Sequence, residues 1–268
     1  MTTLPLRRAR WAATDTATLT GRALAHWRRR PADLLVGLLF PVLLVLMFGY
    51  LFGGAMAVPD GADYREFLLP GMAAMTMLFG VETTYTAVAG DTARGVTDRF
   101  RSLPMSRAAV VTGRALADLL HATAALAVVL GCGVLVGWQP HRGPVRAAAA
   151  VALLLLLRFA MIWLGVYLAL LLRRPEAVAA LQILVWPLGF ASNAFVAPAT
   201  MPGWLAAVAA WNPLSATVAA CRQLFGNPGW GADSWPAQHA WVLAVAWPLL
   251  VMAILVPLAV RRWRELGR

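Results

Sequence analysis

Residues 147–172 read AAAAVALLLLLRFAMIWLGVYLALLL, an apolar run that contains one charged residue, Arg158. A helix rises about 1.5 Å per residue, so about 20 apolar residues cross a hydrocarbon core that is about 30 Å thick. The run does not alternate between apolar and polar residues, as the strands of a membrane β-barrel do. It therefore predicts a helix that spans a membrane.

Similar apolar runs recur along the chain, which has 268 residues, 60% of them hydrophobic and only 13% charged. This composition lies outside the usual range of globular domains. We predict an all-α integral membrane protein with six transmembrane helices at about 34–53, 68–90, 111–136, 147–172, 178–197 and 241–260.

The arginines alternate between the predicted connections. Seven precede the first span, five lie from Arg94 to Arg114, between the second span and the first turn of the third, two lie between the fourth and fifth, and four follow the last. The other connections hold only Arg65, Arg142, Arg146 and Arg222. Because arginine-rich loops close to span ends stay in the cytoplasm, this pattern predicts cytoplasmic termini, at 1–33 and 261–268, around a transmembrane domain at 34–260.

The residue types present limit the possible functions. All 23 basic residues are arginine, so the chain lacks the lysine of a P-loop nucleotide site. The net charge of +11 is divided among short clusters between apolar runs, which argues against a nucleic-acid partner. Cys132 and Cys221 match no metal spacing, so we expect no metal and no cofactor in this chain.

Two flanking segments have an interfacial character. Residues 18–30 place Leu19, Ala23 and Trp27 near one helical face, which predicts an amphipathic helix on the membrane surface. Residues 198–237 follow the fifth predicted span on the outer side and combine proline, glycine and tryptophan with short apolar stretches. We predict short re-entrant outer helices there.

The predicted cytoplasmic connection at 91–107 reads DTARGVTDRFRSLPMSR. It predicts a short charged helix that stops near Pro104, with Ser106 placed to cap the next helix. Phe100 and Leu103 are apolar side chains among arginines, a pattern that suits docking into a groove of a soluble partner. The alternative is an ordinary arginine-rich loop that only sets topology.

This connection resembles the signature connection of type-2 ABC exporter permeases, in particular that of drug-export permeases of the daunorubicin-resistance kind. The shared pattern is an acid, two residues, Arg-Gly, and then Asp-Arg-x-Arg-Ser-Leu-Pro-Met-Ser-Arg. A second box, Asn212, Pro213 and Leu214 followed by Arg222, resembles the Asn-Pro-Leu box of the same family. The resemblance covers nearly the whole chain.

The resemblance implies a six-span permease that pairs with a second copy or a related permease and binds two ABC ATPase subunits. Those subunits would bind ATP and Mg²⁺, and this chain would export a hydrophobic or amphipathic molecule, drug-like or lipid-like, without catalysing covalent chemistry. Segment 91–107 would be the coupling helix, with the residues Asp91, Arg94, Gly95, Asp98, Arg99, Phe100, Arg101, Leu103, Pro104, Ser106 and Arg107.

Four ionisable residues lie inside predicted spans, namely Glu82, Asp118, His121 and Arg158. Such groups are costly in lipid, so they line a path or take a partner. The sequence leaves both roles open, with Arg158 or a nearby hydroxyl as a partner for Glu82, and Arg114 as a partner for Asp118. An alternative function is a proton-coupled secondary transporter that uses Glu82, Asp118 and His121.

Overall fold

The computed structural model describes residue 21 and residues 31–51, 63–95, 107–229 and 234–265. Within these ranges the chain forms helices and no strands, which confirms the all-α prediction. The predicted interfacial helix at 18–30 lies outside the described residues except for Gly21, and so does most of segment 91–107.

Four long helices occupy four of the predicted spans, and each is apolar enough to cross a membrane. They extend beyond the predicted limits because turns of more polar residues continue the helices at their ends. The four are α3 (Tyr64–Ala93), α5 (Arg107–Leu135), α6 (Gly143–Leu172) and α11 (Ala240–Glu265).

Two shorter apolar helices occupy the remaining predicted spans. α2 (Pro31–Leu46) continues as a π-helix over Met47–Leu51, and α7 (Val178–Phe190) follows a 3₁₀ turn over Pro175–Ala177. The predicted span at 178–197 ends too late, because α7 stops at Phe190. The amide of Asn212 donates to the carbonyls of Leu188 and Ala191 at 2.7 and 2.9 Å, and thereby closes that helix end. The count of six spans remains a prediction.

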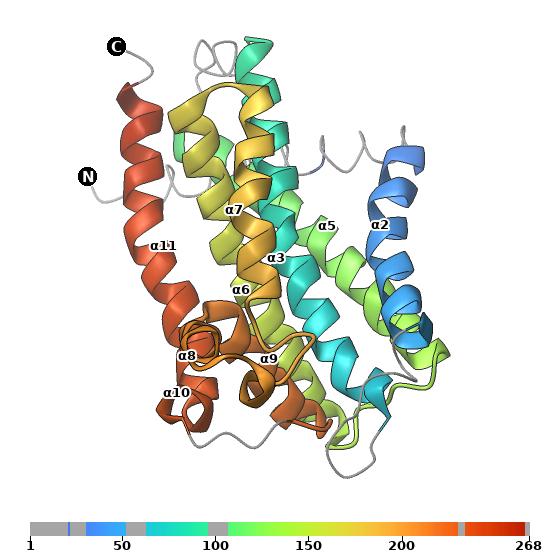
Figure 1. Ribbon diagram of the computed structural model, residues 1–268. Coiled ribbons are helices and arrows are strands. Elements are labelled where there is room, and N and C mark those ends of the chain that lie inside the picture. Colours follow the sequence, from blue (N-terminus) through green and yellow to red (C-terminus); the bar gives the residue numbers. More distant parts are fainter. Residues whose placement is uncertain (1–20, 22–30, 52–62, 96–106, 230–233, 266–268) are drawn as a thin grey trace, which may run out of the picture.

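Helix α3 lies at the centre of the bundle and packs mainly against α6, which in turn packs against α11 (Figure 1). In the most apolar stretch of α3, 72% of the residues are buried, compared with 17% in α11. Many large exposed side chains of α11 and α7 are apolar, among them Ile183, Leu184 and Ile254. Such a surface is suited to lipid.

Three short helices gather at the end of the bundle opposite the C-terminus, where α11 begins (Figure 1). They are α8 (Gly203–Trp211), α9 (Pro213–Phe225) and α10 (Trp235–Gln238). α8 and α9 meet at an angle of 73°. Asn212 ends α8 and caps α9, because its Oδ1 accepts a hydrogen bond of 2.9 Å from the backbone N–H of Leu214.

Candidate functional site

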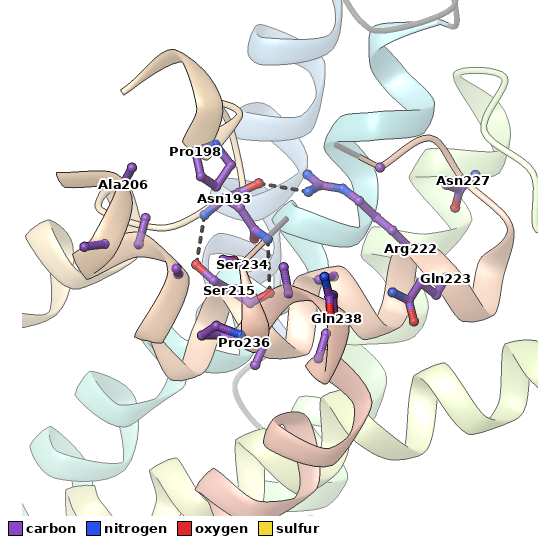
Figure 2. A pocket seen from close by; sticks show the side chains of 18 of the residues that line it. Asn193, Pro198, Ala206, Ser215, Arg222, Gln223, Asn227, Ser234, Pro236 and Gln238 are labelled. Carbon is purple, nitrogen blue, oxygen red and sulfur yellow. Dashed lines mark hydrogen bonds between the residues drawn. The ribbon is translucent and has the colours of Figure 1, made fainter. Parts of the chain in front are cut away.

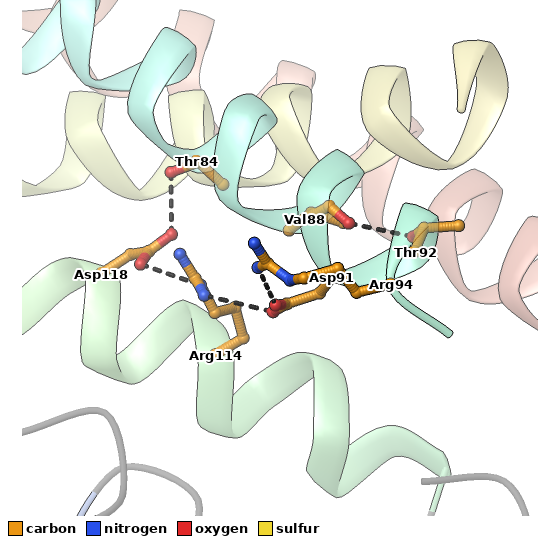
Figure 3. A network of polar contacts seen from close by, with 7 residues as sticks. All are labelled: Thr84, Val88, Asp91, Thr92, Arg94, Arg114 and Asp118. Atoms are coloured by element: carbon orange, nitrogen blue, oxygen red, sulfur yellow. Dashed lines mark hydrogen bonds and ion pairs between the residues drawn. The ribbon is translucent and has the colours of Figure 1, made fainter. Parts of the chain in front are cut away.

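Charges of alternating sign join α3 to α5 at the end of the bundle where segment 91–107 begins (Figure 3). In the last turn of α3, Asp91 Oδ1 lies 2.9 Å from Arg94 Nη2, and Asp91 Oδ2 lies 3.6 Å from Arg114 Nη1. Arg114 Nε is in turn 3.0 Å from Asp118 Oδ1, one helical turn along α5. The structure therefore contains the predicted Arg114–Asp118 pair and extends it to the start of the predicted coupling segment.

The chain of contacts continues into the bundle through a threonine. The hydroxyl of Thr84 on α3 donates to Asp118 Oδ2 at 2.9 Å and accepts from Arg158 Nη2 at 3.0 Å. A hydroxyl group can do both at once. We call the whole set the ionic row, and its members are Arg94, Asp91, Arg114, Asp118, Thr84 and Arg158.

The inner end of the ionic row is fully enclosed. Arg158 is 2% exposed and its Nη1 has no hydrogen-bond partner within the described part of the chain. The guanidinium lies against Gly80, where no side chain occupies the space. A buried cation is costly unless an acid compensates it, so the Thr84 link to Asp118 holds Arg158 where α3, α5 and α6 meet.

Replacing Gly80 by alanine should disturb this arrangement. The new Cβ would overlap the guanidinium of Arg158, which burial prevents from moving freely. We expect Gly80→Ala to lower the free energy of unfolding by about 1–3 kcal/mol, a typical cost of overpacking. Chemical unfolding of the purified protein measures it. In the control Gly131→Ala on α5 the Cβ meets no atom within 4 Å, so an equal loss in both variants would contradict the prediction.

Glu82 takes a different partner from the one predicted. Its Oε2 accepts a hydrogen bond of 3.0 Å from the side-chain amide of Gln182 on α7. Glu82 and Thr84 are two residues apart, and therefore about 200° apart around the helix. Thr84 faces Asp118 and Arg158, whereas Glu82 faces α7. The described contact of Glu82 is therefore neither with Arg158 nor with a hydroxyl, the two kinds of partner that the sequence suggested, and a place for Glu82 along the substrate path stays a prediction.

The three groups of the proton-relay alternative are only partly brought together. His121 lies one turn beyond Asp118 on α5 and is half-buried. The hydrogen bonds described for Glu82 and Asp118 lead to different partners, Gln182 and Thr84. These contacts show no direct link between the two carboxylates.

The Asn-Pro-Leu box organises the other end of the bundle. Asn212 caps α9, Pro213 occupies its first turn, and Leu214 is buried. Arg222 on the same helix is 2% exposed and donates to the carbonyls of Phe67, Asn193 and Ala194 at 3.0, 2.9 and 3.0 Å. Figure 2 shows the bond to Asn193. Its Cζ also lies 3.6 Å from the centre of the Phe67 ring. The box therefore joins α9 to α3 and to the turn after α7.

The coupling residues divide between described and undescribed parts of the chain. Asp91 and Arg94 join the ionic row, Gly95 follows with a φ of 68°, and Arg107 is the first residue of α5. The others lie outside the described residues, and they are Asp98, Arg99, Phe100, Arg101, Leu103, Pro104 and Ser106.

Sequence reasoning missed three residues of this site, Gly80, Thr84 and Gln182. Glycine and threonine are common in membrane helices, and a single glutamine is a weak signal. Only the rotation of α3 relative to its neighbours identifies Thr84 as the group between Asp118 and Arg158.

Comparisons with known proteins agree with the motifs. The family model of the ABC-2 type transporter matches residues 14–225. The chain is 34% identical over 255 residues to the daunorubicin resistance ABC transporter permease protein DrrB1 of Streptomyces coeruleorubidus, covering 95% of this chain and 87% of that protein. It is 28% identical to the putative transport permease ycf38 of Cyanophora paradoxa, over 79% of this chain and 74% of that protein. It is 22% identical to the probable doxorubicin resistance ABC transporter permease protein DrrC of Mycobacterium tuberculosis, over 80% and 78%.

These relatives are transport permeases rather than enzymes, and this chain has several helices that are long and apolar enough to span a membrane. Two comparisons agree on the family. The family model matches most of the chain, and one relative is 34% identical over 95% of the chain. The chain is a membrane protein and belongs to the ABC-2 type transporter family.

Proposed function

We propose that the chain is the transmembrane subunit of an ABC exporter that moves a hydrophobic or amphipathic molecule out of the cytoplasm or the inner leaflet. Two separate ATPase subunits bind ATP and Mg²⁺ and drive the transport. A second copy of the chain, or a related permease, completes the transmembrane path. The names of the relatives, which refer to daunorubicin and doxorubicin resistance, support a drug-like substrate.

The ionic row is the observation that supports the coupling to an ATPase. It begins at Asp91, the first residue of segment 91–107, and ends at Arg158 among α3, α5 and α6. The row becomes less exposed from Asp91 toward Arg158, and Arg114 contacts both Asp91 and the buried Asp118, so a displacement of segment 91–107 that moves Asp91 also changes the environment of Arg114 and Asp118. Motion of a docked ATPase thereby reaches the three packed helices.

The proposed topology has six spans, with both termini in the cytoplasm and α8–α10 as re-entrant helices on the outer side. α7 ends and α11 begins near the same end of the bundle, and α8, α9 and α10 lie between them there (Figure 1). A segment that leaves and returns at one end does not cross the membrane. The arginine-rich segments then all lie at the opposite end, as the positive-inside rule requires.

Charge reversal in the undescribed part of segment 91–107 tests the coupling role. We expect the double variant Arg99→Glu and Arg101→Glu to abolish co-purification of the proposed partner ATPase and to reduce export at least about tenfold, because like charges opposed across an interface cost several kcal/mol. The measurements are affinity purification from membranes and drug accumulation in cells. The control is Arg261→Glu, an exposed arginine of α11. Normal export and ATPase recovery in the double variant would contradict the proposal.

The energy source distinguishes the proposed ATP-driven export from the proton-coupled alternative. We expect export from inverted vesicles to continue when an ionophore collapses the proton gradient while ATP is present. Export that stops under these conditions, and that also stops in a Glu82→Gln variant, would favour the alternative.

A further inference from the structure

A cavity of about 640 Å³ opens among α8, α9, α10 and the start of α11 (Figure 2). This volume lies within the usual range for small-molecule sites. The proposed coupling does not use the cavity, because α8, α9 and α10 lie at the end of the bundle opposite the last turn of α3, where the ionic row begins (Figure 1). Its walls carry eight alanines, and polar side chains lie among them.

The polar lining is positively charged. It contains Arg142 and Arg222, and no aspartate or glutamate is among the described lining residues. Arg222 is buried, and the three acceptors of its guanidinium are neutral carbonyl oxygens. Two of its five N–H groups remain for another acceptor. Arg142 is exposed, and its side chain forms no ion pair with any residue that the structure describes. A buried cation without an acid favours an anionic ligand.

One acceptor in the lining lacks a donor. Asn193 donates its side-chain amide to the carbonyl of Ser215 at 3.2 Å, while its buried Oδ1 has no partner within the described ranges. A buried acceptor without a donor costs about 1–3 kcal/mol. This oxygen is enclosed by protein and does not face the cavity, so the two arginines determine the charge of the complementary ligand.

The surroundings of the cavity place it at a membrane interface. Trp204, Trp211, Trp235 and Trp241 are all more than half exposed, and they lie on the helices that surround the cavity. The rings of Trp211 and Trp235 stack with their centroids 6.0 Å apart. Exposed tryptophans gather at the level of the lipid headgroups. A ligand with a phosphate group is plentiful there.

We infer that this cavity binds the headgroup of an anionic phospholipid. The phosphodiester lies between Arg142 and Arg222. The alanine walls contact the glycerol backbone and the first carbons of the acyl chains.

The test uses the full-length protein, purified in an uncharged detergent, and three probes: dihexanoyl phosphatidylglycerol, dihexanoyl phosphatidylcholine and inorganic phosphate. Native mass spectrometry or calorimetry measures their binding. We expect phosphatidylglycerol to bind at least about tenfold more tightly than either other probe, because the choline cation of phosphatidylcholine opposes the two arginines and inorganic phosphate lacks the glycerol and acyl carbons, and about 1.4 kcal/mol is sufficient for a factor of ten. Equal binding of phosphatidylcholine, or of phosphate alone, would overturn the assignment to an anionic lipid.

Two variants and one control locate the site. Arg142→Gln should weaken phosphatidylglycerol binding about tenfold, because it removes one of the two cations. Ala219→Leu should weaken binding by narrowing the cavity. Arg146→Gln removes an equally exposed arginine one turn further along α6, outside the lining, and should leave binding unchanged. If Arg142→Gln and Arg146→Gln weaken binding equally, or if Ala219→Leu binds normally, the inference is wrong. Neither variant changes the ionic row, so both should still recruit the ATPase. A variant that loses lipid binding but recruits the ATPase therefore tests the lipid site alone, without testing the proposed transport function.

Discussion

Replacing Asp118 by leucine is expected to lower the free energy of unfolding by about 3–5 kcal/mol, the usual cost of removing one partner from a buried ion pair. Asp118 is 8% exposed and is the acid that both Arg114 and, through Thr84, Arg158 approach. Without it, Arg158 remains a buried cation with no acid near it. Unfolding of the purified protein in denaturing detergent measures the loss.

A second substitution shows whether the loss comes from the stranded charge. In the double variant Asp118→Leu and Arg158→Met, the uncompensated cation is absent, and replacing a buried ionic pair by apolar side chains is often nearly neutral. Most of the lost stability should therefore return. The control is Asp91→Leu at the exposed end of the ionic row, where a surface pair contributes about 1 kcal/mol or less. The interpretation fails if the double variant is no more stable than Asp118→Leu alone.

Replacing Arg222 by methionine is expected to have an effect of similar size, about 3–5 kcal/mol, at the opposite end of the bundle. The variant loses three charge-assisted hydrogen bonds, and buried carbonyls of Asn193 and Ala194 lose their donor. Each orphaned buried acceptor costs about 1–3 kcal/mol. The contact of the guanidinium with the Phe67 ring is also lost. Chemical unfolding of the purified variant measures the total loss in the free energy of unfolding.

The neighbouring residue supplies a matched control. Gln223 is exposed on the same helix, so Gln223→Met introduces the same side chain without breaking any of these bonds and should change stability by about 0.5 kcal/mol or less. Arg222→Lys keeps the charge but loses the planar array of donors, so we expect a stability between those of the wild type and Arg222→Met. If Arg222→Met were as stable as Gln223→Met, Arg222 would not hold the turn after α7.

The two buried arginines differ in the groups that compensate them. Arg158 shares a threonine with an acid, whereas Arg222 is surrounded by backbone carbonyls. A carboxylate next to Arg222 would neutralise its charge. The described residues that line the cavity include no aspartate or glutamate, so the positive charge of Arg222 attracts an anion. At Arg158, by contrast, the nearby acid makes the site part of a protein network.

The amino-acid sequence alone determined that the protein is helical and membrane-embedded, where its long helices lie, and which family it resembles. These properties are local, because the length of an apolar run and the need to satisfy backbone hydrogen bonds in lipid do not depend on distant residues. The predicted end of the fifth span at residue 197 was wrong because the end of α7 depends on residues that are distant in sequence. Residues 191–197 are apolar enough to continue a helix, but Asn212 and Arg222, distant in sequence, bind the carbonyls around the turn.

The tertiary structure decided which polar groups meet. The pairing of Asp118 with Arg114 was predictable because both lie on one helix, one turn apart. The partners of Glu82 and Arg158 were not, since they depend on the rotation of α3 against α5, α6 and α7. The cavity beside Arg222 likewise exists only because α8, α9 and α10 fold together at one end of the bundle. Contacts between helices depend on packing across the whole bundle, and no periodicity within a single segment specifies them.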